Sequence, residues 1–169
     1  YVEDEIYAAQ IYSVALGGGM SSRLFQEIRE KRGLCYSIFA QSVAYRDGGS
    51  TLIYAGTSED KVKELSELTF DELKRAADSF SQSELDRARA QMKAGLLMGL
   101  ESASSRAERL ARMISIWDRI PSLEETVQKI DAISLTDMRS YAEKIAVSSK
   151  SAIALYGPVG LAPDLSELE

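Results

Sequence analysis

The chain has 169 residues, of which 45% are hydrophobic and 27% are charged, a composition that is ordinary for one globular domain. Its 20 basic and 26 acidic residues give a net charge of -6, which argues against a nucleic-acid-binding protein, since such proteins present a basic face. Histidine is absent and Cys35 is the single cysteine, so an internal disulfide and a zinc site of recognisable type are both excluded.

Hydrophobic periodicity and capping residues predict helices and strands along the whole chain. In chain order we expect helices at residues 4–16, 21–32, 58–79, 83–100, 102–120, 123–133 and 135–146, and strands at residues 34–45, 50–57 and 151–156. Asp4, Ser21 or Ser22, and Ser83 are expected to cap three of these helices. Asp47-Gly48 is a strong hairpin signal between the first two strands. The pattern predicts an α+β fold in which helices pack on one face of an antiparallel sheet.

We expect a single domain over residues 1–160 and a loose acidic tail over residues 161–169. Three strands make a thin sheet, so we expect a further strand upstream of Tyr1 in a longer parent chain. No apolar run approaches the roughly 20 residues that span a bilayer. We therefore expect a soluble protein, of the bacterial cytoplasm or periplasm.

The triplet Gly17, Gly18 and Gly19 is the first candidate site. Consecutive glycines are kept where the backbone needs positive φ or approaches another group closely. Free N–H groups at the following helix start favour an anion. The segment lacks the lysine of a phosphate-binding P-loop, however, and it follows a helix where that motif follows a strand. An anion-binding loop and a plain helix–helix turn both stay open.

Arg29 and Tyr36 form the second candidate site, because Gly33 between them ends the helix and reverses the chain. The end of the helix and the start of the strand should then lie side by side. A guanidinium and a phenol are suitable donors for a peptide carbonyl or an oxyanion. The ordinary alternatives are a solvated arginine in a charged helix and a half-buried strand aromatic.

Several separated segments, which together cover nearly the whole chain, carry a family resemblance. They are GGGMSSRLF at residues 17–25, IREKRGL at 28–34 with Tyr36-Ser37, AQMK at 90–93, SSRAERL at 104–110, KIDAI at 129–133, and Gly157-Pro158. They closely resemble the second domain of the pitrilysin and mitochondrial processing peptidase family, which are inverzincin metallopeptidases.

The resemblance implies repeated α+β domains in two halves that close around an unfolded peptide. Zinc is expected on a His-x-x-Glu-His helix plus a later Glu, which this chain lacks, so the metal belongs to another domain. The resemblance assigns substrate-carbonyl and oxyanion binding to Arg29 and Tyr36. It assigns substrate contact, less securely, to a glycine-rich loop of which Gly17–Gly19 remain.

The expected partners are the upstream zinc-binding domain, a second subunit in a homodimer or heterodimer, and a peptide substrate. The function that follows is the non-metal half of a zinc metalloendopeptidase, and the chain alone should be inactive. Two alternatives stay open. One is a non-catalytic scaffold or regulatory subunit of the same fold, and the other is an anion-binding module built on Gly17–Gly19.

Overall fold

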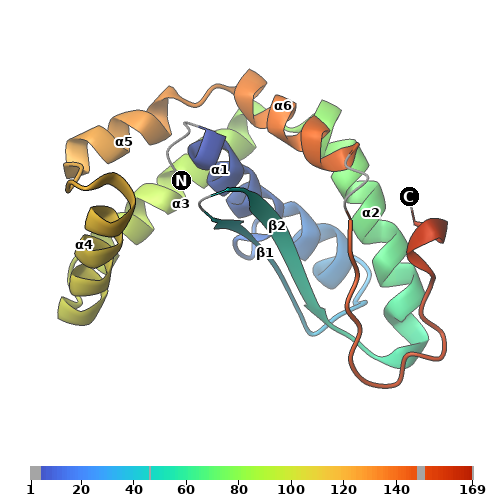
Figure 1. Ribbon diagram of the computed structural model, residues 1–169. Helices are drawn as coiled ribbons and strands as arrows, with labels where there is room; N and C mark the ends of the chain where they lie inside the picture. The colour runs from blue at the N-terminus through green and yellow to red at the C-terminus, as the bar shows by residue number, and fades with distance from the viewer. Residues whose placement is uncertain (1–4, 46, 148–150, 169) are drawn as a thin grey trace.

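The computed structural model describes residues 5–45, 47–147 and 151–168, and Figure 1 shows their arrangement. The α-helices are α1 (Glu5–Gly17), α2 (Val62–Ser79), α3 (Gln82–Gly99), α4 (Ala103–Trp117), α5 (Leu123–Ala132) and α6 (Leu135–Ala146). The strands are β1 (Ser37–Ala44) and β2 (Gly49–Gly56), and the shorter segments are the π-helix Phe25–Glu30 and the 3-10 helices Glu59–Lys61 and Leu165–Glu167. The predicted α+β class is confirmed.

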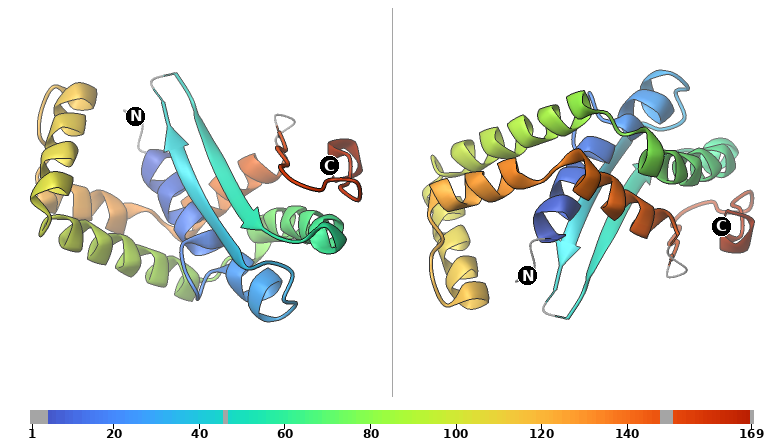
Figure 2. Two further views of the ribbon diagram at one scale, coloured as in Figure 1. Left: turned by 90° about the horizontal axis from the view of Figure 1, so that it is seen from below. Right: turned by 90° about the horizontal axis from the view of Figure 1, so that it is seen from above.

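Helix α1 lies at the centre of the fold, with the hairpin on one side and α3 and α6 on the other (Figure 2). Ile11, Tyr12 and Leu16 of α1 are completely buried, as expected for a helix that is apolar around most of its circumference. The Tyr12 ring meets Phe80 and Tyr141 edge-on, at centroid distances of 5.8 and 5.4 Å. The helices therefore cover a single face of the sheet.

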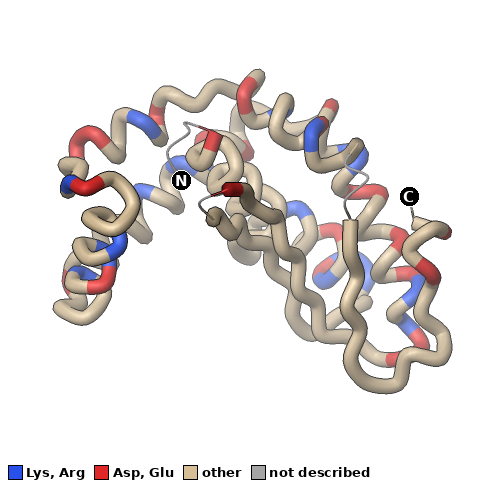
Figure 3. The backbone as a smooth tube through the Cα atoms, viewed as in Figure 1, with Lys and Arg blue, Asp and Glu red and all other residues tan. Residues whose placement is uncertain are grey.

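The hairpin pairs in register from Ser37 with Gly56 to Ala44 with Gly49. Along β1, Ile38 and Ala40 are buried against the helices, whereas Phe39 between them is exposed. Phe39 stacks on its cross-strand partner Tyr54 at a centroid distance of 5.1 Å. The open face is thus aromatic, and Figure 3 shows that the described parts of both strands carry no charged residue.

Serine caps begin four helices, at Ser81, Ser102, Ser122 and Ser134. The predicted cap at Ser83 is wrong, because Ser81 forms a capping box with Glu84. The Ser81 backbone N–H donates to the Glu84 carboxylate at 2.8 Å, and the Ser81 hydroxyl accepts from the Glu84 backbone N–H. The α3 helix therefore starts one residue earlier, and its glutamate is fixed at the first turn.

Two other predicted elements differ in the structure. Residues 151–156 are extended but are not a strand, because no described strand lies beside them to share a hydrogen-bond ladder. Helix α4 ends at Trp117 rather than near residue 120, since Asp118 takes a left-handed conformation with φ of 52°. The predicted cap Asp4 lies outside the described residues.

Residues 161–169 were expected as a loose tail, and their described part, which extends to Leu168, contains a 3-10 turn and buries the Leu168 side chain. The Leu168 carbonyl accepts a hydrogen bond from Lys74 of α2 at 3.1 Å. Apolar burial and this bond hold the described part of the tail against α2.

Candidate functional site

The segment that carries Arg29 is wound as a π-helix, Phe25–Glu30, where an ordinary α-helix was predicted. The Lys31 backbone N–H reaches back five residues to the Gln26 carbonyl at 3.0 Å, the spacing that defines this helix. Ile28 is completely buried on its inner side, and the segment packs against β1 and α2. These contacts fix the helix and leave the Arg29 side chain on its outer side, one-third exposed.

Gly33 turns the chain from this helix into β1 with a left-handed φ of 62°. Its N–H donates to the Arg29 carbonyl at 3.0 Å, and the next N–H, of Leu34, donates to Ile28 at 3.0 Å. Tyr36 then donates through its backbone N–H to the Gly56 carbonyl at the end of β2, at 2.9 Å. Both the end of the helix and the start of the strand are therefore anchored, as the glycine predicted.

The structure brings Arg29 and Tyr36 into direct contact, through the main chain of Tyr36. Arg29 Nε donates to the Tyr36 carbonyl oxygen at 2.7 Å, while the Tyr36 side chain is 87% exposed. The sequence predicted two side chains lying together, and the observed contact is a guanidinium on a carbonyl with the phenol projecting into solvent. Neither group is enclosed in the protein interior. Both are accessible to a molecule that approaches from outside.

Two more groups surround the Arg29 guanidinium. Its Nη1 donates to the Glu30 carboxylate at 2.9 Å, and its Cζ lies 4.5 Å from the centre of the Phe25 ring. Glu27, on the same helix, instead pairs with Lys31 at 2.5 Å and with Arg32 at 3.2 Å. The charged side chains of this segment therefore form two separate groups. One group is Arg29 with Glu30, and the other is Glu27 with Lys31 and Arg32.

The glycine triplet serves close packing and not positive φ, since the described positive-φ glycines are Gly33 and Gly157. A Cβ on Gly17 would lie 2.4 Å from the Ala40 nitrogen of β1. The Gly18 carbonyl accepts from Gln91 of α3 at 2.5 Å, and the Gly19 carbonyl accepts from the Ser22 hydroxyl at 2.6 Å. The triplet thus joins α1, β1 and α3 at one point.

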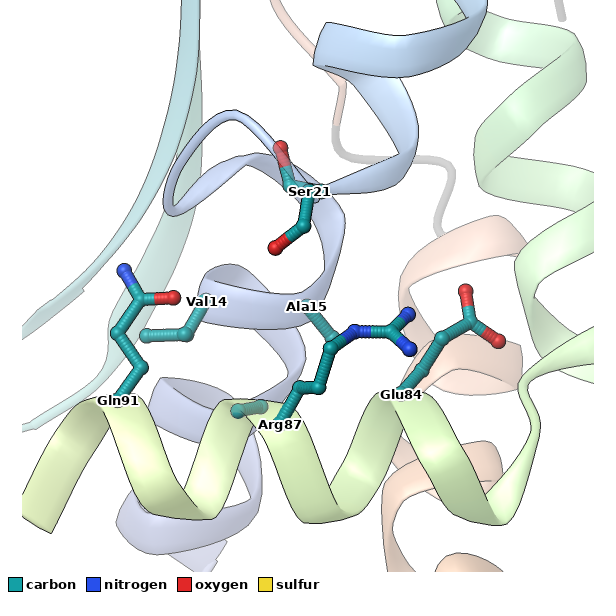
Figure 4. A pocket seen from close by; sticks show the side chains of 8 residues that line it. Val14, Ala15, Ser21, Glu84, Arg87 and Gln91 are labelled. Carbon is teal, nitrogen blue, oxygen red and sulfur yellow. The ribbon is translucent and has the colours of Figure 1, made fainter.

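The anion-binding interpretation of this triplet finds little support in the geometry. The helix that follows has six residues and is a π-helix, so it offers little dipole to an anion. Beside the loop, Glu84, Arg87 and Gln91 project from the side of α3 that faces Ser21, and they help to line a shallow depression (Figure 4). Its volume of about 10 Å³ holds roughly one water molecule. It is too small for a phosphate-bearing ligand.

Sequence reasoning missed the role of Arg23, whose side chain is 13% exposed. Its Nε and Nη2 donate to the two Glu84 carboxylate oxygens at 2.6 and 3.0 Å, and Nη1 donates to the Ser79 hydroxyl at 2.6 Å. Its Cζ also lies 4.2 Å from the centre of the Phe80 ring. A correct assignment of Ser81 as the α3 cap would have singled out Glu84, but no local signal pairs it with Arg23.

Glu84 illustrates how this cluster controls ionisation. Burial alone would raise the pKa of the Glu84 carboxyl. Hydrogen bonds from Arg23, from the Ser81 hydroxyl and from the Ser81 backbone outweigh this effect and lower the pKa to about 2. Glu84 is therefore ionised in the folded protein at neutral pH. At Cys35, burial raises the thiol pKa against the opposing effect of Arg29, so this cysteine is not activated as a nucleophile.

Among the residues that the structure describes, the donor groups do not fit a zinc ion. Within residues 5–45, 47–147 and 151–168, no three His, Cys, Asp or Glu side chains gather closely enough to hold a metal. Within the same described residues, no helix is both long enough and apolar enough to cross a membrane.

A family model described as the peptidase M16 inactive domain matches residues 2–92, which is more than half of the chain. The chain belongs to this family. The match covers the segment from α1 through the first half of α3 and includes Gly17–Gly19, Arg29 and Tyr36. The predicted family resemblance is confirmed.

A relative of this M16 inactive domain, an uncharacterized zinc protease from Rickettsia bellii (strain RML369-C), is 36% identical over 158 residues. The alignment covers 94% of this chain and 38% of the relative, so the chain spans about two fifths of the length of that relative. The relative is thus a longer protein that is named as a zinc protease.

Solved structures share the fold. A peptidase M16 inactive domain from Pseudomonas fluorescens superposes with a TM-score of 0.68 at 22% identity, covering 84% of this chain and 34% of that one. A chain of complex III2 from Candida albicans, with Inz-5 bound, superposes with a TM-score of 0.76 at 23% identity. That match covers 85% of this chain and 36% of the Candida chain. At these identities the likeness concerns the fold alone.

Proposed function

We propose that the full-length protein is a zinc metalloendopeptidase and that this M16 inactive domain is its non-metal half. In this proposal the domain holds an extended peptide substrate through Arg29 and Tyr36, facing a zinc site on another domain or subunit. The names of the relatives support a zinc protease, and the lack of histidine in the sequence and of a metal-binding cluster among the described residues supports placing the metal elsewhere. By the same reasoning, the isolated domain should have no peptidase activity.

The observation that carries the proposal is the 2.7 Å hydrogen bond from Arg29 to the Tyr36 carbonyl. It ties a cationic donor to the residue that presents an exposed phenol. During peptide hydrolysis negative charge develops on the carbonyl oxygen of the scissile bond. Donors that are already oriented toward that oxygen stabilise the charge without reorganisation during the reaction.

We propose the Gly17–Gly19 loop as a second, weaker contact with the peptide. Met20 at the end of the loop is 75% exposed, and the loop is fixed by the Gln91 and Ser22 hydrogen bonds. A fixed loop with an exposed apolar tip can pack against a bound peptide without losing much conformational entropy.

A Tyr36→Phe substitution in the full-length protein tests the assignment. Removing one oxyanion donor should lower kcat about 10²-fold and leave KM within about threefold, since the lost bond forms mainly in the transition state. Steady-state cleavage of a fluorogenic peptide measures both constants. The matched control is Tyr54→Phe, which alters another exposed tyrosine of the hairpin. Wild-type turnover in Tyr36→Phe would remove the phenol from the mechanism.

The alternative is a non-catalytic scaffold or regulatory subunit. Its support is that a chain of complex III2 has the same fold. The two functions differ in the rest of the protein. A peptidase needs a metal-binding motif such as His-x-x-Glu-His in its other domain or in its partner subunit. Stoichiometric zinc in the purified complex, together with peptide cleavage that a chelator abolishes, would support the peptidase. Lack of both would support the scaffold.

A further inference from the structure

Helix α3 belongs to the core in its first half and leaves the core in its second half. Its buried residues are Leu85 and Ala88, both in the first two turns. Its end, Leu-Leu-Met-Gly-Leu at residues 96–100, contains no charged residue, yet Leu97 and Met98 are more than half exposed. An apolar helix end that faces solvent is typical of a surface that another segment covers.

Helix α4 continues this exposed apolar surface. It stands apart from the core in Figure 1, and no other described helix or strand makes an extended contact with it. Its apolar residues recur at helical spacing along one side, at Leu110, Met113, Ile114 and Trp117. Of these, Met113 alone is buried. A helix of 15 residues is marginal in water on its own, so we expect a packing partner for residues 96–120, which we call the arm.

A hydrogen-bond donor without a partner lies on the same helix. The Nη2 atom of Arg109 is buried, and none of the described residues accepts a hydrogen bond from it. Arg109 stands one turn before Met113, at the edge of the apolar side of α4. Buried charged donors are costly without an acceptor and are nearly always paired in native proteins. The partner of the arm should therefore place a carboxylate or carbonyl oxygen beside Arg109.

The two ends of the described chain lie at different distances from the arm. In both views of Figure 2 the start of α1 lies between the hairpin and α4, whereas the C-terminal 3-10 helix lies on the far side of the molecule, by α2. The Rickettsia bellii relative is longer than this chain, which spans 38% of it. Polypeptide that precedes α1 emerges beside the arm. A segment tethered there binds at a high effective concentration, which a separate partner lacks.

We propose that the arm is the surface on which this domain docks the segment directly upstream of residue 1 in the full-length protein. That segment covers the exposed apolar residues of the arm and supplies an oxygen acceptor to Arg109. The docked segment fixes how the preceding part of the protein is joined to this domain. The inference concerns assembly, and it does not depend on the roles proposed for Arg29 and Tyr36.

Site-specific photocrosslinking in the full-length protein tests the proposal. Ile114, which is half exposed, is replaced by p-benzoylphenylalanine, and mass spectrometry identifies the crosslinked peptide. The crosslink should lead to the same chain, within about 20 residues before residue 1, a length that spans at most about 70 Å. The matched control carries the probe at Arg112, which pairs with Glu108 on the opposite, exposed side of α4. It should give little of that product.

Each other result at position 114 would overturn the proposal. A product of twice the mass would show that a second copy of the chain covers the arm. A crosslink to any other part of the protein would assign the surface to that part. Lack of any crosslink would show that the arm faces solvent.

Hydrogen exchange of the full-length protein tests the docked surface and the acceptor separately. Ile114→Asp places a charge in the surface and should speed exchange of the α4 amides about tenfold or more, with α1 unchanged. Arg109→Met keeps an apolar side chain without the guanidinium, and it should speed α4 exchange about threefold or more because the acceptor loses its donor. The control Arg112→Gln should stay within about twofold of the wild type. Unchanged exchange in Ile114→Asp, or slower exchange in Arg109→Met, would contradict the docking.

Discussion

Arg23 and Arg29 belong to the same short segment, yet their surroundings differ. Each guanidinium lies over an aromatic ring, Phe80 at 4.2 Å and Phe25 at 4.5 Å. Arg23 is nearly buried, and its hydrogen-bond partners come from the α2–α3 junction, far away in sequence. Arg29 is one-third exposed, and its partners are neighbours in sequence. The first arginine joins distant elements, and the second remains accessible to a ligand.

The two arginines should differ most in how much stability is lost when each is replaced by alanine, and the larger loss should occur in Arg23→Ala. The change leaves the largely buried Glu84 carboxylate without its cation, which should lower the free energy of unfolding by about 3 kcal/mol or more. Arg29→Ala should cost less than about 1 kcal/mol, because an exposed pair contributes little. Urea unfolding of both variants measures the contrast. Equal losses would contradict the structural role assigned to Arg23.

The pH dependence of stability should reflect the same cluster. The Glu84 pKa is lowered from its ordinary 4.5 to about 2 in the folded protein. A lowered carboxyl pKa stabilises the fold above pH 4.5, and this contribution is lost as the pH falls from about 4.5 toward 2. A shift of this size corresponds to about 3 kcal/mol. Urea titrations at pH 6 and pH 3 should show a steeper loss in the wild type than in Glu84→Gln. Identical losses of stability in the wild type and Glu84→Gln would contradict the lowered pKa assigned to Glu84.

Gly17 lies just before this segment, and its replacement should change stability by a smaller amount. Gly95 serves as the control, because the same substitution there should change stability in the opposite direction. In Gly17→Ala the new methyl would lie 2.4 Å from the Ala40 nitrogen and 2.7 Å from its Cβ, so the α1–β1 contact must open. We expect a loss of about 2 kcal/mol. Gly95→Ala in α3 meets nothing within 4 Å and should gain about 0.5 to 1 kcal/mol. Thermal or urea unfolding measures both changes. An unchanged free energy of unfolding in Gly17→Ala would contradict the close approach of α1 to β1 at this position.

Features encoded by neighbouring residues could be predicted from the sequence. Ser122 and Ser134 stand immediately before the helices predicted at residues 123–133 and 135–146, and they cap them in the structure. Gly33 takes the predicted left-handed turn, because a turn and a cap each depend on a few adjacent backbone groups. The hairpin at Asp47-Gly48 was found for the same reason. Arg29 was placed beside Tyr36 correctly, since that turn is local. Its partner atom, a backbone carbonyl rather than the phenol, was not predictable from residue types.

Features that depend on distant contacts were missed. The Arg23–Glu84 pair joins residues 61 positions apart, and nothing local marks it. The π-helix is fixed by packing against β1 and α2, and residues 151–156 need a neighbouring strand to become one. The cap at Ser81 is different, because the serine and the glutamate of its capping box were readable. The spacing of Ser81 and Glu84 therefore favours Ser81 over Ser83 as the cap.

The central claim is that Arg29 and Tyr36 act on one substrate oxygen, and a double-mutant cycle on kcat tests it most directly. Arg29→Ala, Tyr36→Phe and the double variant are compared in the full-length protein with a fluorogenic peptide. If the two groups act as a unit, each single change should lower kcat about 10²-fold, and the double variant should be little worse than either. Losses that simply multiply, or wild-type kcat in either single variant, would contradict it.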